Sequence, residues 1–305
     1  MKIILKIFLI IFIPLIFFLT YLSTIGIETE RLNTQIKTKV KEINSDLDIE
    51  LNEVKIILNP FNLRLNVKTI GPKIFTHNKT LDIENIKTDI SIRSLIVNEF
   101  SLETLEISTK TVEIKDLLFF YRSIYQVPEI IVLERLLKIK GYLIVNLNLE
   151  FDSDGNLKEN FNVYGFIKDT KFSIFNDYNI DKLNFSFDIS KDNLIFSDIK
   201  FKLNSLDFKS EIVRAKKDKD QYLLTGSIDN SSILLDSRNI SFLKKIFPSL
   251  LNVKEISFSA NNKFSLNVDK KFKFKDIKVN STIEVDEAKI LNKYSLNEIF
   301  PHPSL

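Results

Sequence analysis

The chain has 305 residues, which is long enough for one large β domain or two smaller ones to bury a core. Its 43 basic and 40 acidic residues nearly balance, and the lysines are spread along the chain rather than gathered in a block, so the charge gives no argument for nucleic-acid binding. Cysteine is absent, which excludes disulfides, thiolate metal sites and cysteine nucleophiles.

Residues 1–27 predict a single membrane anchor. An apolar run begins at Ile7, passes through Leu15 and reaches Leu22, and no charge interrupts the chain before Glu28. The run has roughly the 20 residues that a helix needs to cross a bilayer. No small-residue cleavage site follows it, which disfavours the alternative of a cleaved signal peptide. Basic residues precede the run and acidic residues follow it, so the N-terminus is expected in the cytoplasm and the body outside, which in a bacterium is the periplasm.

Residues 28–45 predict an amphipathic helix that connects the anchor to the body. The apolar residues Leu32, Ile36, Val40 and Ile43 recur at spacings of three and four, with charged residues between them. This spacing places them on one face of a helix.

Residues 46–305 predict an antiparallel β domain. Apolar and polar residues alternate in many segments, which is typical of strands with one apolar and one wet face and argues against parallel βαβ units. Two stretches without alternation, near 116–137 and 241–251, predict short helices that cover a sheet edge or close an end. The residues expected on the shared apolar face are Leu63, Leu65, Val67, Leu147, Leu149, Phe185, Phe187 and Leu266.

Local signals in the β domain predict hairpins and irregularities. The turn sequences Asp152–Asn156 and Lys191–Asn193 are expected to join pairs of strands. Asn52 and Glu53 shift the phase of the apolar residues, as a β-bulge would. The segment 163–169 echoes the segment 224–230, each with a glycine at its third position, which suggests a repeated hairpin unit.

No residue pattern predicts catalysis. The two histidines, His77 and His302, are far apart in sequence and lack metal-ligand spacing, and no phosphate-binding or nucleophile motif is present. We therefore expect no enzyme activity, no metal and no cofactor. The 26 Phe residues fit either a filled β-sandwich core or an open sheet with an apolar trough. Periodicity alone does not separate the two, and without any resemblance to a known family the sandwich, the more usual arrangement, is favoured.

The order of features resembles the N-terminal part of the AsmA/TamB-like proteins of Gram-negative bacteria. A cytoplasm-facing stub and one helix lead into an amphipathic helix and a series of strands. The segments that carry the resemblance are Gly26–Leu32, Leu58–Leu63, Ile86–Leu95, Leu105–Lys110, Lys115–Ser123, Phe151–Gly155 and Gly165–Asp169. It is a resemblance of pattern over most of the chain, and the chain is shorter than many members of the family.

The resemblance implies an elongated, curved antiparallel β-groove with short covering helices behind an inner-membrane anchor. It further implies a periplasmic protein that guides phospholipid acyl chains towards the outer membrane and supports envelope integrity. The expected partners are phospholipid, the inner membrane and another envelope protein that completes the path. The alternative is an anchored periplasmic scaffold, or an outer-membrane assembly factor, with a filled sandwich and no lipid cargo.

Overall fold

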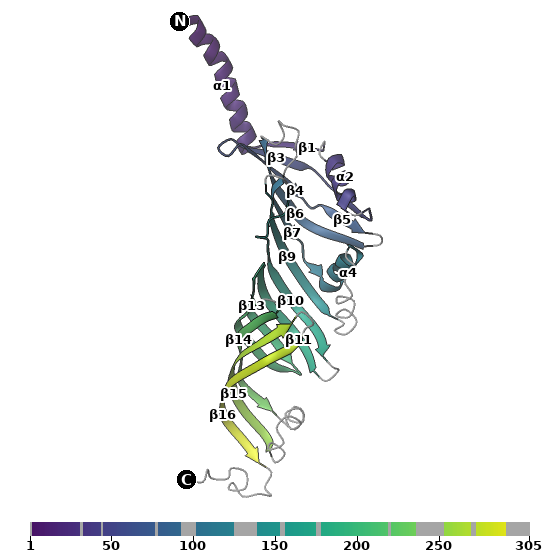
Figure 1. The fold of residues 1–305 in the computed structure, drawn as a ribbon, viewed down its shortest axis with the longest axis vertical. Coiled ribbons are helices and arrows are strands. Elements are labelled where there is room, and N and C mark those ends of the chain that lie inside the picture. The colour runs from purple at the N-terminus through teal and green to yellow at the C-terminus, as the bar shows by residue number, and fades with distance from the viewer. Residues whose placement is uncertain are drawn as a thin grey trace. The chain divides into compact units, whose positions relative to one another are not determined.

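The computed structural model describes residues 2–30, 33–43, 45–76, 79–92, 102–124, 139–152, 156–174, 178–218, 221–235, 253–269 and 273–290. Strands dominate, and sixteen of them belong to one open antiparallel sheet, which confirms the mainly β, antiparallel prediction (Figure 1). The main path through the sheet runs β1-β3-β4-β6-β7-β9-β10-β11-β12-β13-β14-β15-β16, with β2, β5 and β8 as side branches.

In the part of the chain that the structure describes, the helices are few and lie in the first half. They are α1 (Lys2–Thr24), α2 (Asn33–Ile43) and α4 (Ile114–Ile124). The strands are β1 (Ile27–Thr29), β2 (Leu47–Glu50), β3 (Val54–Asn59), β4 (Arg64–Ile70), β5 (Lys73–Thr76), β6 (Lys79–Ser91), β7 (Leu102–Thr109), β8 (Val112–Glu113), β9 (Lys140–Glu150), β10 (Asn162–Ile174), β11 (Tyr178–Ser190), β12 (Asn193–Leu203), β13 (Leu206–Asp218), β14 (Gln221–Leu235), β15 (Val253–Asp269) and β16 (Phe274–Ile290).

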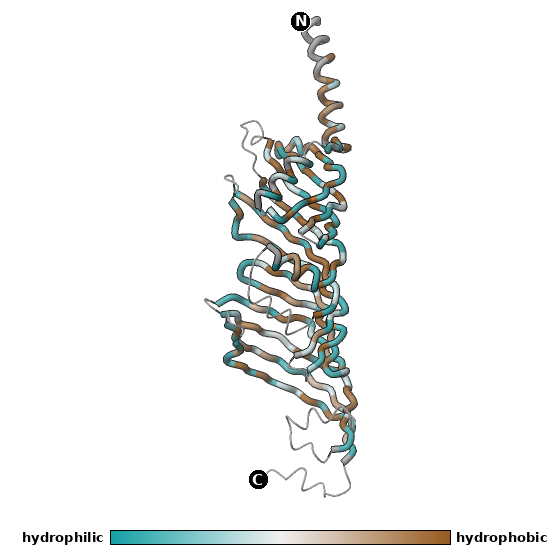
Figure 2. The backbone as a smooth tube through the Cα atoms, turned by 90° about the vertical axis from the view of Figure 1, so that its right-hand side faces the viewer, coloured by the Kyte–Doolittle hydropathy of each residue, from teal (hydrophilic) through white to brown (hydrophobic). Residues whose placement is uncertain are grey.

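The chain divides into two compact units. The first contains Met1–Ile167 and Phe187–Lys191, and the second contains Lys168–Ser186 and Asp192–Leu305. Brown and teal alternate along the strands of both units in Figure 2, as expected for strands whose successive side chains point to opposite faces.

Helix α1 covers the segment predicted as an anchor and ends at a glycine. The N–H groups of Ile25 and Gly26 both donate to the carbonyl of Tyr21, and Gly26 has φ +78°, the left-handed cap that closes many helices. Leu15 is exposed and Leu22 is half-buried, whereas the side chain of Ile7 lies outside the described residues. Within the described part of the chain, no helix combines the length and the apolar character required of a membrane span.

The connecting helix is shorter than the sequence predicts. Ile27–Thr29 form strand β1, which pairs with Ile56–Val54 of β3, and helix α2 begins only at Asn33. Glu28 therefore lies in a strand and not in a helix. A partner distant in sequence supplies the backbone hydrogen bonds that a helix would otherwise satisfy locally.

Asp48 links α2 to the sheet through charge. Its Oδ1 accepts from the N–H of Ile49 at 2.8 Å, and its Oδ2 lies 3.4 Å from Nζ of Lys41 on α2. The Ile49 N–H, followed by the Lys41 charge, holds the pKa of Asp48 below the ordinary 3.8.

We predict that Asp48 makes the docking of α2 sensitive to acid. A lowered pKa in the folded state stabilises the fold above the unfolded value, and this stabilisation disappears as the pH falls through the folded value. Asp48→Asn should therefore lower the urea midpoint at about pH 6 and lower it by less at about pH 3. Equal losses for Asp48→Asn at both pH values would contradict this role, whereas Lys41→Gln, which spares the Ile49 bond, should show a weaker version of the same trend.

Helix α4 confirms the start of the first predicted helical stretch. It packs against β6, β8 and β9, with Phe120 buried, and Oδ1 of Asp116 lies 2.7 Å from Nζ of Lys79. The rest of that stretch, residues 125–137, lies outside the described residues. So does the second predicted helix at 241–251.

The predicted turns are confirmed, but the predicted bulge is wrong. Strand β11 ends at Ser190 and β12 begins at Asn193, while Asp152 and Asn156 close the other hairpin with a backbone bond of 2.9 Å. At Asn52 the chain passes from β2, which pairs with β5, to β3, which pairs with β1 and β4. The phase shift there marks a change of ladder rather than a bulge within one strand.

In the second unit, several strands carry irregular positions. Non-glycine residues with positive φ occur within the strands at Asp169, Lys182, Asp198, Ser232 and Asp276. At Asp198 the apolar residues of β12 change from even positions (194, 196) to odd ones (199, 201, 203). The register with β13 is the same on both sides of Asp198, so the left-handed residue, and not an extra residue, accompanies the change of phase there.

Candidate functional site

In the first unit, the register of five strands gathers apolar side chains on one face of the sheet. Residues paired across an antiparallel ladder point to the same face. Three rows of paired residues cross the strands: Ile56, Val67, Thr88, Leu105 and Leu149; Leu58, Leu65, Ile90 and Leu102; and Val54, Thr69, Ile86, Ile107 and Leu147. Of the residues predicted from the sequence, Leu65, Val67, Leu147 and Leu149 therefore share one face, as expected.

The opposite face of the same strands is charged and polar. Its rows are Lys55, Lys68, Lys87, Glu106 and Asn148, and Ile57, Asn66, Asp89, Thr104 and Glu150, in which Ile57 is the one apolar residue. Lys87 and Glu106 form an ion pair of 3.5 Å. The two faces therefore differ as sharply as the alternation predicts.

The apolar face combines fully buried side chains with half-buried ones. Val54, Val67 and Ile90 form a buried cluster, against which Ile36 of α2 packs. Further along, on β7 and β9, four side chains are only half-buried. We call these four, Leu105, Ile107, Leu147 and Leu149, the apolar strip.

Leu63 does not belong to this face. It lies in the turn between β3 and β4 with φ +49° and is 64% exposed. The turn is formed by Pro60 and by Asn59, whose Oδ1 accepts from the N–H of Asn62 at 3.3 Å. The prediction for Leu63 is wrong because the apolar alternation continues through this turn, whereas the strand β4 begins at Arg64.

Phe187 packs over a glycine of a neighbouring strand. It is 9% exposed, and its Cζ lies 2.8 Å from the place where a Cβ would stand on Gly165. Gly226 has a similar neighbour, because its register partner Phe264 comes within 3.1 Å of the equivalent position. The sequence echo between 163–169 and 224–230 thus has a structural counterpart, a glycine on one strand shielded by an aromatic ring on another.

The second unit has its own apolar face. Paired rows cross β13 to β16, among them Val213, Gly226, Phe264 and Val279, and Ile233, Phe258 and Val285. The predicted Leu266 lies opposite Leu224 on this face and is half-buried. The predicted Phe185 packs edge-on against Phe196 at 5.7 Å between ring centroids.

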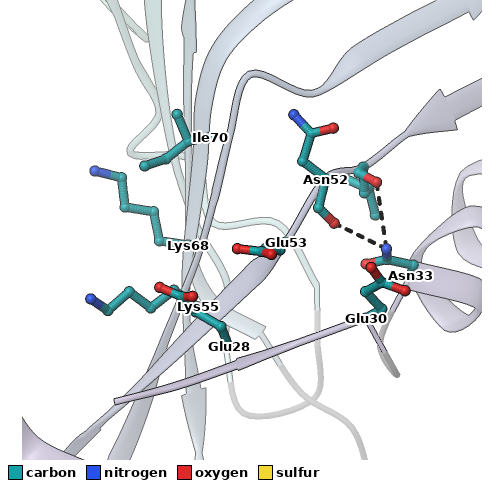
Figure 3. Close-up of a pocket in the computed structure, with 9 residues that line it drawn as sticks. Glu28, Glu30, Asn33, Asn52, Glu53, Lys55, Lys68 and Ile70 are labelled. Carbon is teal, nitrogen blue, oxygen red and sulfur yellow. Dashed lines mark hydrogen bonds between the residues drawn. The ribbon is translucent and has the colours of Figure 1, made fainter. Parts of the chain in front are cut away.

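A polar pocket of about 630 Å³ lies beside the start of the sheet in the first unit (Figure 3). It is lined by Glu28, Glu30, Asn33, Leu51, Asn52, Glu53, Lys55, Lys68 and Ile70. The amide nitrogen of Asn33 donates to the carbonyl of Asn52 at 3.1 Å, while its Oδ1 is buried without a partner among the described residues.

This pocket was missed by the sequence reasoning, since its walls come from α2, β1, β3 and β4. The one feature of the sequence that relates to it is that Lys55 and Lys68 alternate with apolar residues, which predicts both lysines on the polar face of the sheet. It combines carboxylates and ammonium groups, and no histidine lines it. In the described residues, no cluster of three or more His, Asp or Glu could hold a metal ion.

Comparisons with known proteins gave no match: no family model, no curated protein and no solved structure resembles the chain significantly. The resemblance to the AsmA/TamB-like family therefore stays a prediction. The apolar strip is the feature of the first unit that calls for a functional explanation, because its four leucine and isoleucine side chains remain partly open to solvent.

Proposed function

We propose that the protein is a membrane-anchored carrier of phospholipid acyl chains, held in the bacterial inner membrane with its body in the periplasm. In this proposal the apolar faces of the sheet form a groove that guides the chains towards the outer membrane, with another envelope protein completing the path. The observation that carries the proposal is the apolar strip, partly open to solvent on an open sheet.

The physics of this function requires no catalytic group. An acyl chain that leaves a bilayer exposes methylene groups to water at about 0.8 kcal/mol each. Rows of Leu, Ile and Phe side chains offset this cost, while the head group stays in water. Shallow and repeated contacts let a chain slide, whereas one deep pocket would retain it.

The anchor is supported by the sequence. The stretch from Ile7 to Ile27 contains no charged residue, and the flanking charges follow the positive-inside rule. Protease protection in fractionated cells tests this part, because an intact inner membrane should shield the body from protease added on the cytoplasmic side. A mature N-terminus found after residue 23 would replace the anchor with a cleaved signal peptide.

We predict that lipid crosslinks to one face of β9 and not to the other. A photoreactive residue at Leu147 or Leu149 lies on the apolar strip, whereas one at Asn146 or Asn148 lies on the polar face of the same strand. Crosslinking in cells, followed by mass spectrometry of the purified full chain, should attach phospholipid at the two leucine positions only. The adjacent asparagine positions are matched controls for expression, folding and local exposure.

The same experiment separates the carrier from a scaffold. A scaffold without lipid cargo predicts that probes at Leu147 and Leu149 reach protein alone and that the folded protein purifies free of lipid. Leu149→Ser, which shortens one side chain of the strip, should reduce the bound lipid while circular dichroism remains unchanged. Unaltered lipid content in this variant would argue against the strip as the binding surface.

A further inference from the structure

Strand β16 presents a long edge that is open in the described part of the chain. It runs from Phe274 to Ile290 and pairs with β15 on one side, and no described strand pairs with its other side (yellow in Figure 1). Every described side chain from Phe274 to Lys289 is exposed. Five of these are large and apolar, with exposed fractions of 56–65%: Phe274, Ile277, Val279, Ile283 and Val285.

An open edge of this length is normally protected, since its free N–H and C=O groups bind other strands. Charges of one sign would repel a second copy of the same edge. Here the polar face of β16 carries both signs, with Lys278 before the middle of the strand and Glu284 after it. Among the described residues, neither side chain takes part in an ion pair.

Two of the three register shifts between β15 and β16 lie at equal distances from Ser281, and the third lies at Lys289 and Ile290. The register with β15 shifts once around Asp276, which has φ +49°, and again at Asp286, which is skipped between Val285 and Glu287. Asp276 accepts a hydrogen bond from Nδ2 of Asn267 at 2.9 Å. Asp286 accepts from the hydroxyls of Ser232 and Ser257 at 2.9 and 3.1 Å, so both bulge carboxylates are held by their own sheet.

We propose that β16 pairs with β16 of a second copy, antiparallel, with Ser281 opposite its own symmetry mate on a two-fold axis. This register places Asp276 opposite Asp286, so the bulges of the two strands coincide. The two carboxylates repel each other, and this cost is offset by Lys275, which lies opposite Glu287 in the same register. On the apolar face, Val279 then lies opposite Ile283, and Ile277 opposite Val285. On the polar face, Lys278 lies opposite Glu284, and this pair occurs twice.

Neighbouring registers lose these matches. A shift by two residues brings a bulge of one strand against a regular position of the other and removes the opposition of Lys278 and Glu284. A shift by one residue breaks the correspondence of the faces. The proposed pairing also goes beyond the lipid function, since it requires no cargo and can be tested in its absence.

Disulfide trapping tests the register in a chain that has no natural cysteine. Directly opposed residues of an antiparallel pair have Cα atoms about 4.5–5.5 Å apart, within the range of a disulfide. Ser281→Cys should therefore give a covalent dimer of the detergent-extracted full chain under mild oxidation. Asn280→Cys is the matched control, because its symmetry mate is displaced by about 7 Å along the strand and lies out of range.

A charge swap tests the energetics. Lys278→Glu and Glu284→Lys each turn two attractive pairs into two repulsive ones, which should raise the dimer dissociation constant roughly tenfold. The double variant Lys278→Glu/Glu284→Lys should restore dimerisation, as measured by sedimentation equilibrium. The proposal is overturned by a monomeric native chain, by equal crosslinking through residues 280 and 281, or by a double variant no better than the single ones. If residues after 290 pair with the free edge of β16, the native chain stays monomeric, and this result also overturns the proposal.

Discussion

Gly165→Ala is expected to disrupt the pairing around β10 in the first unit, with a loss of about 3 kcal/mol or more of folding free energy. A methyl group on Gly165 would lie 2.0 Å from the carbonyl oxygen of Ile144 and 2.8 Å from Cζ of Phe187. The carbonyl oxygen belongs to the backbone of β9, so it cannot move without separating the strands. The Phe187 ring is nearly buried and cannot swing out without exposing apolar surface.

Two other glycines provide graded controls for this prediction. Gly226→Ala meets Cγ2 of Val213 at 2.9 Å and the carbonyl oxygen of Ile212 at 3.1 Å. It should cost less than Gly165→Ala, because its backbone contact is much less close than the 2.0 Å at Gly165. Gly71→Ala has open space but φ +66°, so it should cost only about 1 kcal/mol from backbone strain. Urea titrations followed by circular dichroism in a fixed detergent give the ranking. A Gly165→Ala protein as stable as the native chain would show that the strands are less close than the structure indicates.

The alternation of residues predicted the faces of the sheet because side-chain direction in a strand is a local property. Leu65, Val67, Leu147 and Leu149 were correctly assigned to one face for this reason. The same rule failed at Leu63. This residue continues the apolar alternation of Leu65 and Val67, but it lies in the turn before β4 begins. The change in the alternation of apolar residues at Asp198 is also visible in the sequence, since Phe196 has an even number and Ile199 an odd one.

Features that depend on distant partners could not be predicted. The three residues of β1 carry no strand signal of their own, and they are extended because β3 offers a free edge. Periodicity could not separate a filled sandwich from an open sheet, because an alternating strand is equally suited to a second sheet or to an open face. The choice between these depends on what packs on the apolar side, such as Ile36 of α2, and this contact is not encoded near the strands it covers.

Leu235→Asn should be the most destabilising substitution in the second unit. Leu235 is fully buried, in a cluster with Leu206 and Ile233 that Phe208, Ile256 and Phe258 surround. Removing the leucine side chain costs about 2–5 kcal/mol through lost burial and the cavity it leaves. An amide at the same place adds the cost of a polar group without a partner, about 1–3 kcal/mol. We therefore expect a loss of about 4 kcal/mol or more, seen as a lower urea midpoint.

The adjacent residue is a matched control of the same type. Leu234 lies opposite Ser257 on the other face of β14 and is 59% exposed, so Leu234→Asn should change the stability by less than about 0.5 kcal/mol. Both variants replace a leucine of β14 by asparagine at neighbouring positions. They differ in the face of the strand that receives the amide. Equal effects at both positions would mean that this part of β14 has no buried face, and the cluster around Leu206 and Ile233 would then not form the core of the second unit.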